Sequence, residues 1–160
     1  MKKTRKKKHS QRKTLKIKLE NTLTRRKNIT GFRPTTAQSH YWFKHLNMGL
    51  FNNKLPTVPL YILRMTHDWG RCWANWDNRK CRKGTYDQNV IPYGKCEIDF
   101  AIELHSNYPT WRDFIETLAH EMVHLYQMTV LEDPYSNHNA NFFAFRNKFR
   151  LAGLNISRTG

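Results

Sequence analysis

The most constraining feature of this sequence is the run His120-Glu121-Met122-Val123-His124, which reads H-E-x-x-H. Residues four apart lie on one face of an α-helix, one turn from each other, so the two imidazoles can bind the same metal ion. Glu121 then lies beside the first histidine, where its carboxylate can act as a base on a water at that metal. The pattern predicts a helical zinc site suited to hydrolysis.

The residues around this run predict a helix from Trp111 to about Met128. Thr110 is a typical N-cap, and Asp113 follows three residues later as in a capping box. The apolar residues recur at helical spacing: Phe114, Leu118, Met122, Val123, Leu125 and Tyr126. The two histidines and Glu121 fall beside this stripe, which indicates a helix with one face on a core and the motif at its margin.

A catalytic zinc usually has three protein ligands and keeps one position for water. One large subclass of zinc hydrolases takes its third histidine from H-E-x-x-H-x-x-G-x-x-H. This chain has Gln127 in place of that glycine and Val130 in place of that histidine. The third ligand must therefore lie elsewhere.

His138 is the better candidate for the third ligand. It begins a second predicted helix, Asn139 to Ala152, which follows a turn-forming stretch at 132–137 and ends at Gly153, a plausible C-cap. The rival is Glu132, which lies about two helical turns beyond His124 and would not point back at the metal if the helix continued.

Several segments in this order resemble the SprT-like metalloproteases. They are Phe51-Asn52-Asn53-Lys54-Leu55-Pro56, Trp69-Gly70-Arg71-Cys72-Trp73-Ala74, the H-E-x-x-H run and His138-Asn139-Ala140-Asn141-Phe142. The resemblance covers roughly Thr35 to Asn155. It departs at Asn139, where the family often has glycine, and the sequence up to Gly160 contains no cysteine-rich zinc ribbon, which many members carry after this domain.

The resemblance implies a small zincin-like fold and a zinc-dependent endopeptidase. It places His120, His124 and His138 on Zn²⁺ and makes Glu121 the general base. It also implies that the substrates are proteins bound or crosslinked to DNA. The sequence leaves the oxyanion donor open among Tyr126, Tyr135 and Arg146.

Charge divides the chain into two parts. Residues 1–27 hold 13 of the 28 Lys and Arg and one acid, Glu20, whereas the rest carries a net charge of +4 out of the total +16. Like-charge repulsion and a lack of apolar residues predict that the first 13 residues are disordered. We therefore expect a basic, disordered arm over residues 1–30 and a metalloprotease domain over residues 31–160.

Basic arms bind polyanions by releasing counterions. The residues expected to contact nucleic acid, most simply DNA, are Lys2, Lys3, Arg5, Lys6, Lys7, Lys8, Arg12 and Lys13. Two other classes of function fit the same features: a nucleic-acid-binding protein with a structural zinc site, and a component of a virus or phage particle. Glu121 counts against a structural site, which needs no base.

Three cysteines, Cys72, Cys81 and Cys96, match no known metal spacing, and no export signal or membrane-spanning run is present. We expect reduced thiols in an intracellular protein without membrane contact.

The remaining pattern predicts an α+β fold with a small, mostly antiparallel sheet packed on the motif helix. A helix from Thr35 or Thr36 to Leu50 comes first. Strands are expected at residues 60–65, 70–76, near 86–91 and at 96–104, the last with strict apolar alternation. Residues 77–94 would suit a lid, and an extended substrate could add to an exposed sheet edge. We expect Trp69, Trp73 and Trp76 mainly in the core, with the alternative that one of them lines the cleft.

Overall fold

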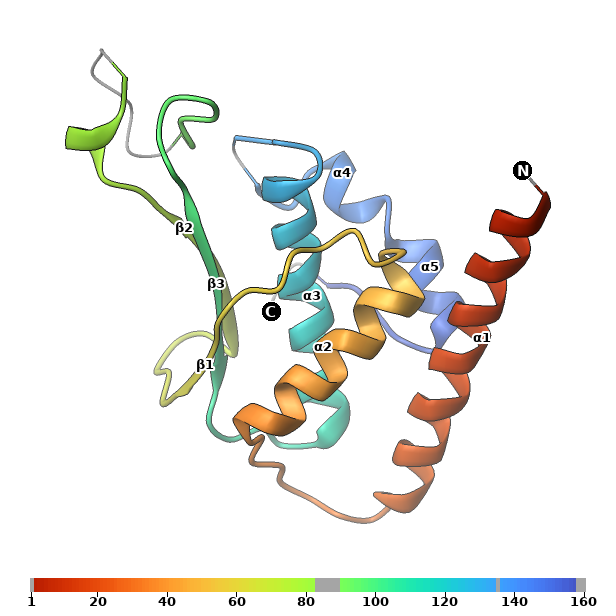
Figure 1. The fold of residues 1–160 in the computed structure, drawn as a ribbon. Helices are drawn as coiled ribbons and strands as arrows, with labels where there is room; N and C mark the ends of the chain where they lie inside the picture. Colours follow the sequence, from red (N-terminus) through yellow and green to blue (C-terminus); the bar gives the residue numbers. More distant parts are fainter. Residues whose placement is uncertain (1, 83–89, 135, 158–160) are drawn as a thin grey trace.

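The computed structural model describes residues 2–82, 90–134 and 136–157, with the backbone alone for residues 2–6 and 8 (Figure 1). Within these residues one sheet has the order β1-β3-β2, formed by β1 (Leu60–Leu63), β3 (Asp99–His105) and β2 (Gly70–Asn75). The pair β2–β3 is antiparallel, but β1–β3 is parallel. The fold is α+β as expected, and the sheet is mixed rather than mostly antiparallel.

Helices pack in two layers against one face of this sheet (Figure 1). α2 (Thr36–Leu50) and α3 (Trp111–Thr129) contact the strands, and α1 (Lys2–Arg25) lies outside α2. Both inner helices begin at the predicted caps: Thr35 forms a capping box with Gln38, and the Thr110 hydroxyl accepts the Asp113 backbone N–H at 3.1 Å. None of the described helices has both the length and the apolar character needed to cross a membrane.

Two sequence-based expectations differ in detail from the structure. The predicted helix after His138 is two short helices, α4 (Ala140–Phe143) and α5 (Arg146–Ala152), and α5 ends at Gly153 with a left-handed φ of 86°. Most of the strand expected near Tyr86 to Ile91, and part of the suggested lid, lies outside the described residues. A 3-10 turn, η1 (Asn78–Lys80), follows β2.

The predicted disorder of the basic arm is wrong, because α1 is a helix that packs on the domain. Leu15 and Leu19 are 2% and 1% exposed and belong to the same core cluster as α2 and α3. α1 approaches α2 so closely that a Cβ on Gly49 would lie 2.5 Å from Leu15 Cδ2. Leu15, Leu19 and Leu23 recur every four residues, which places them on one helical face. The burial of that apolar face stabilises the helix by more than the repulsion between its charges destabilises it. The domain boundary near residue 30 stays a prediction.

Replacing Leu15 by alanine should lower the free energy of unfolding by about 2–5 kcal/mol, since it removes buried methyl groups and leaves a cavity. Ile17→Ala is the matched control on the same helix, because Ile17 is 57% exposed, and should change stability by no more than about 0.5 kcal/mol. Urea unfolding of both variants measures this. Equal, small effects would mean that α1 does not dock in solution.

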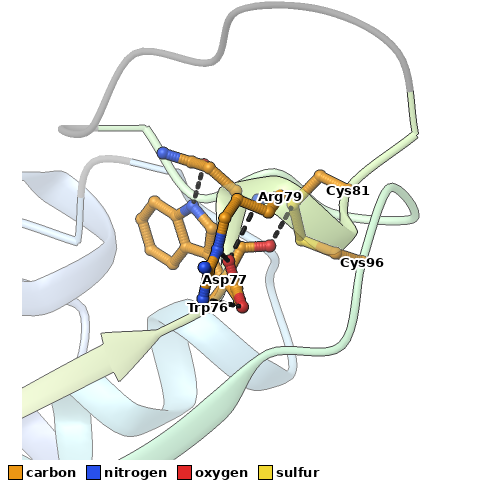
Figure 2. Close-up of a disulfide and its surroundings, with 6 residues drawn as sticks. Trp76, Asp77, Arg79, Cys81 and Cys96 are labelled. Carbon is orange, nitrogen blue, oxygen red and sulfur yellow. Dashed lines mark hydrogen bonds and ion pairs between the residues drawn. A yellow bond between two sulfur atoms is a disulfide. The ribbon is translucent and has the colours of Figure 1, made fainter.

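Cys81 and Cys96 form a disulfide next to η1, so the expectation of three reduced thiols is wrong for these two (Figure 2). β2 and β3 are antiparallel neighbours with Asn75 opposite Asp99. The chain leaving β2 and the chain entering β3 therefore run side by side, which brings the two Cα atoms to 4.4 Å. Cys72 is the free thiol of the described residues. With two of the three cysteines joined, the thiols no longer indicate an intracellular location.

Alkylation under non-reducing, native conditions should leave Cys81 and Cys96 unmodified, because both sulfurs are in the disulfide. Cys72 should react only after unfolding, since its side chain packs against the core and burial raises the pKa of its thiol. Mass spectrometry after alkylation, with and without prior reduction, gives the count. Ready alkylation of Cys81 or Cys96 in the unreduced protein would contradict the structure.

Candidate metal centre

The three predicted histidine ligands come together in space. His120 and His124 lie one turn apart on α3, and His138 lies just before α4. The Nε2 atom of His138 is 3.1 Å from that of His120 and 3.2 Å from that of His124. The potential ligand atoms of all three lie within 4.8 Å of one another, and this cluster of the described residues does not include Glu132.

The aromatic ring of Phe142 packs against all three histidines. The Phe142 ring centroid lies 4.8 Å from that of His120, 4.9 Å from that of His124 and 4.7 Å from that of His138. Phe142 is fully buried on α4. Its ring limits the orientations of all three imidazoles, and α4 thereby holds His138 against the two histidines of α3.

Gln127 sets the tautomer of His124. Its Nε2 donates to the Asn137 backbone carbonyl at 2.9 Å and to Asn139 Oδ1 at 3.0 Å. The other end of this amide, Oε1, must therefore face His124 Nδ1, 2.9 Å away, and accept its proton. The proton on Nδ1 leaves the Nε2 lone pair of His124 free to bind a metal ion.

Gln127 is the functional residue that the sequence analysis missed. In the sequence it stands out only because it replaces the glycine of H-E-x-x-H-x-x-G-x-x-H. Its position three residues after His124 was a usable signal, because such residues are neighbours on a helix. The same amide ties α3 to the turn that carries His138.

Burial keeps the imidazoles neutral. It is the main cause that lowers the pKa of His120 to about 3, with His124 and His138 acting in the same direction. Burial also lowers the pKa of His124 to about 4, against the effect of the Gln127 hydrogen bond. Both side chains therefore present lone pairs at neutral pH. Together with His138 they form a set of three imidazoles, a donor set that fits Zn²⁺.

Glu121 is buried between α3 and β2. It is 4% exposed, and its Oε1 lies 3.9 Å from His120 Nε2. Burial raises the pKa of Glu121 to about 8, although a hydrogen bond from the Cys72 backbone acts to lower it. β2 reaches the helix here because Gly70 has no side chain: a Cβ would lie 2.7 Å from Thr117 Cγ2 and 3.1 Å from Glu121 Cγ.

A small cleft of about 90 Å³ adjoins the cluster. His120, Thr117 and Glu116 line one side of it, and Trp69 lines another. Trp69 is 40% exposed, so its assignment to the core is wrong. Trp73 and Trp76 are half-buried, and each indole N–H donates to a polar side chain, that of Glu103 or Asn78. The exposed ring of Trp69 makes it a wall of the cleft.

The structure gives less support to the candidate oxyanion donors and to the proposed nucleic-acid contacts. Tyr126 packs against Phe51 and Phe145, and the Arg146 guanidinium lies over the Phe143 ring. Neither contact is with the histidine cluster, and Tyr135 lies outside the described residues. Of the proposed nucleic-acid contacts, Lys7 and Lys13 are exposed and Arg12 is partly exposed on α1. The described residues do not include the side chains of Lys2, Lys3, Arg5, Lys6 and Lys8.

A family model agrees with this geometry. The model of the SprT-like family matches residues 39–159, which include the three histidines and Glu121. The chain belongs to the SprT-like family. Members are generally metallopeptidases, in agreement with a histidine cluster that could hold a metal ion. Searches of curated proteins and of solved structures gave no significant match to this SprT-like chain.

His138→Ala should weaken Zn²⁺ binding by more than about 100-fold, because it removes one of three proposed ligands, and losing even a residue that only orients a ligand costs about 10–100-fold. His67→Ala is the control, since His67 is exposed and outside the cluster, and its affinity should equal that of the unmodified protein. Competition with a chromogenic chelator measures both. If Zn²⁺ binds both variants equally well, His138 is not a ligand.

Proposed function

We propose that this SprT-like protein is a zinc-dependent endopeptidase. The observation that carries the proposal is the convergence of three imidazoles beside the buried carboxyl group of Glu121. His120, His124 and His138 would hold the ion through Nε2. When bound, Zn²⁺ supplies a Lewis acid that polarises a carbonyl and lowers the pKa of water.

Glu121 is the proton carrier in this proposal. Its carboxylate accepts a proton from the attacking water and delivers it to the nitrogen of the leaving amine. The surrounding protein suits both halves of that task. The hydrogen bond from the Cys72 backbone lowers the pKa of Glu121 and so favours the ionised carboxylate that accepts the proton, whereas burial raises the pKa and so favours the protonated form that delivers it. A purely structural zinc site would gain nothing from a buried carboxylate at this position.

The edge of the sheet supports an extended protein substrate. β2 pairs only with β3 among the described strands, so its other side is free to accept a strand. The same strand contacts Glu121 through Gly70 and Cys72. A peptide added to β2 would run past the histidine cluster, and the cleft beside Trp69 would receive one of its side chains. Main-chain pairing makes such recognition tolerant of sequence.

Nucleic acid is the proposed partner, and DNA-bound or DNA-crosslinked proteins are the proposed substrates. The support is the charge of α1, whose 24 residues include 11 Lys or Arg and one Glu. A strongly basic helix attracts nucleic acid at low salt. It would raise the local concentration of protein targets on the same strand.

Glu121→Gln should abolish cleavage of a generic unfolded protein and leave Zn²⁺ affinity within about twofold, because the amide cannot accept the proton and is not a ligand. Glu132→Gln is the matched control: Glu132 is exposed and outside the cluster, so activity should persist. Gel assays with Zn²⁺ or chelator, each with and without single-stranded DNA, separate metal dependence from DNA dependence. Undiminished cleavage by Glu121→Gln would disprove the mechanism.

A further inference from the structure

A groove of about 700 Å³ lies between α1 and α2, away from the histidine cluster. Cationic side chains line one wall: Lys18 and Arg25 on α1, and Arg26 directly after it. Aromatic side chains line the other: Tyr41 and Trp42 on α2, and Trp111 at the start of α3. We call this the α1–α2 groove. Figure 1 shows the two helices side by side, joined at one end by the loop that carries Phe32.

The positive charge of the groove is not neutralised by carboxylates. No Asp or Glu is among its described lining residues, and its three cations form no ion pair with other described residues. Their hydrogen bonds go to neutral groups: Lys18 Nζ to the Tyr41 hydroxyl at 3.3 Å, Arg25 to Thr22 and Arg26 to the Gly31 carbonyl. The groove therefore presents charge that an external anion can use.

The aromatic wall is rigid and partly exposed. Tyr41 is 47% exposed, and its ring meets the edge of Trp42 at a centroid distance of 5.2 Å. Trp42 in turn packs against Trp111 at 5.1 Å, with both nearly buried. The Tyr41 ring is thus held in place by a buried aromatic base. Lys18 Nζ lies 5.8 Å from the Tyr41 ring centroid and the His45 ring centroid lies 4.5 Å from it, so a nucleobase can stack on the exposed part of the ring that these neighbours leave uncovered.

We propose that the α1–α2 groove binds single-stranded nucleic acid. Lys18 and Arg25 contact phosphates, and Tyr41 stacks against one base. Charge alone would also suit an acidic peptide or an anionic bilayer, but neither has a planar group for the Tyr41 ring. A duplex keeps its bases stacked inside, so it offers phosphates without a free base face. This inference rests on the proposed nucleic-acid partnership of α1 and gives it a site, but it does not depend on the proposed peptidase activity. Its residues are separate from those at 2–13.

The charge part is tested with the full chain carrying Glu121→Gln and a labelled single strand of about 12 nucleotides. Lys18→Gln with Arg25→Gln should reduce the slope of log affinity against log salt by about 1.4, because each lost phosphate contact accounts for about 0.7. Lys54→Gln with Lys95→Gln removes the same charge from exposed positions outside the groove and should leave the slope unchanged. Equal slope changes would show general attraction only and overturn the proposal.

The stacking part is tested at Tyr41. Tyr41→Leu should weaken single-strand binding by at least about fivefold, whereas Tyr41→Phe, which keeps the ring, should bind like the parent. Fluorescence anisotropy gives the affinities, and thermal melting checks that each variant is folded. Unchanged binding by Tyr41→Leu would overturn the proposal. Tyr41→Leu should cost the single strand more affinity than it costs a duplex of equal length, polyglutamate or phosphatidylserine vesicles. The opposite order would also overturn the proposal.

Discussion

The close packing of β2 against α3 is the contact on which the candidate site depends. Gly70 lets the strand backbone approach the helix at Thr117 and Glu121, where any side chain would collide. This approach removes Glu121 from water and gives it the Cys72 backbone as a hydrogen-bond partner. Gly70 therefore determines how closely β2 approaches the carboxyl group that the proposed mechanism uses.

A second constraint joins the ligands that are distant in sequence. H-E-x-x-H orders two imidazoles by helix geometry alone, but nothing local orders His138. Gln127 supplies that order, because its amide bonds His124 at one end and the backbone and side chain of the 137–139 turn at the other. Asn139 extends this link to Asp133 and also caps α4 through the Phe142 backbone N–H. His138 is placed by a polar network that begins on α3.

The sequence predicted the elements whose structure follows from contacts between neighbouring residues, and it missed those that depend on contacts between distant segments. α3, its Thr110 cap and the pairing of His120 with His124 follow from contacts within one helix, and all were predicted. α1 was not predicted, because the charges of residues 1–13 indicate disorder, whereas the apolar spacing of Leu15, Leu19 and Leu23 begins just beyond them. The Cys81–Cys96 disulfide depends on the β2–β3 register and leaves no trace in a spacing of 15 residues. The parallel pairing of β1 with β3 also joins segments that are distant in the sequence, so the sequence alone does not predict it.

The docking of α1 changes how its charge can act. A disordered basic arm would lose conformational entropy on binding a polyanion, and this cost would offset part of the attraction. With Leu15 and Leu19 buried, that ordering has already occurred on folding, so Lys18 and Arg25 face a ligand at fixed positions beside Tyr41. The same leucines belong to the core that α2 and α3 share. Deleting α1 would therefore remove the proposed nucleic-acid contacts together with core packing, and only substitutions on its exposed face test the proposed contacts separately.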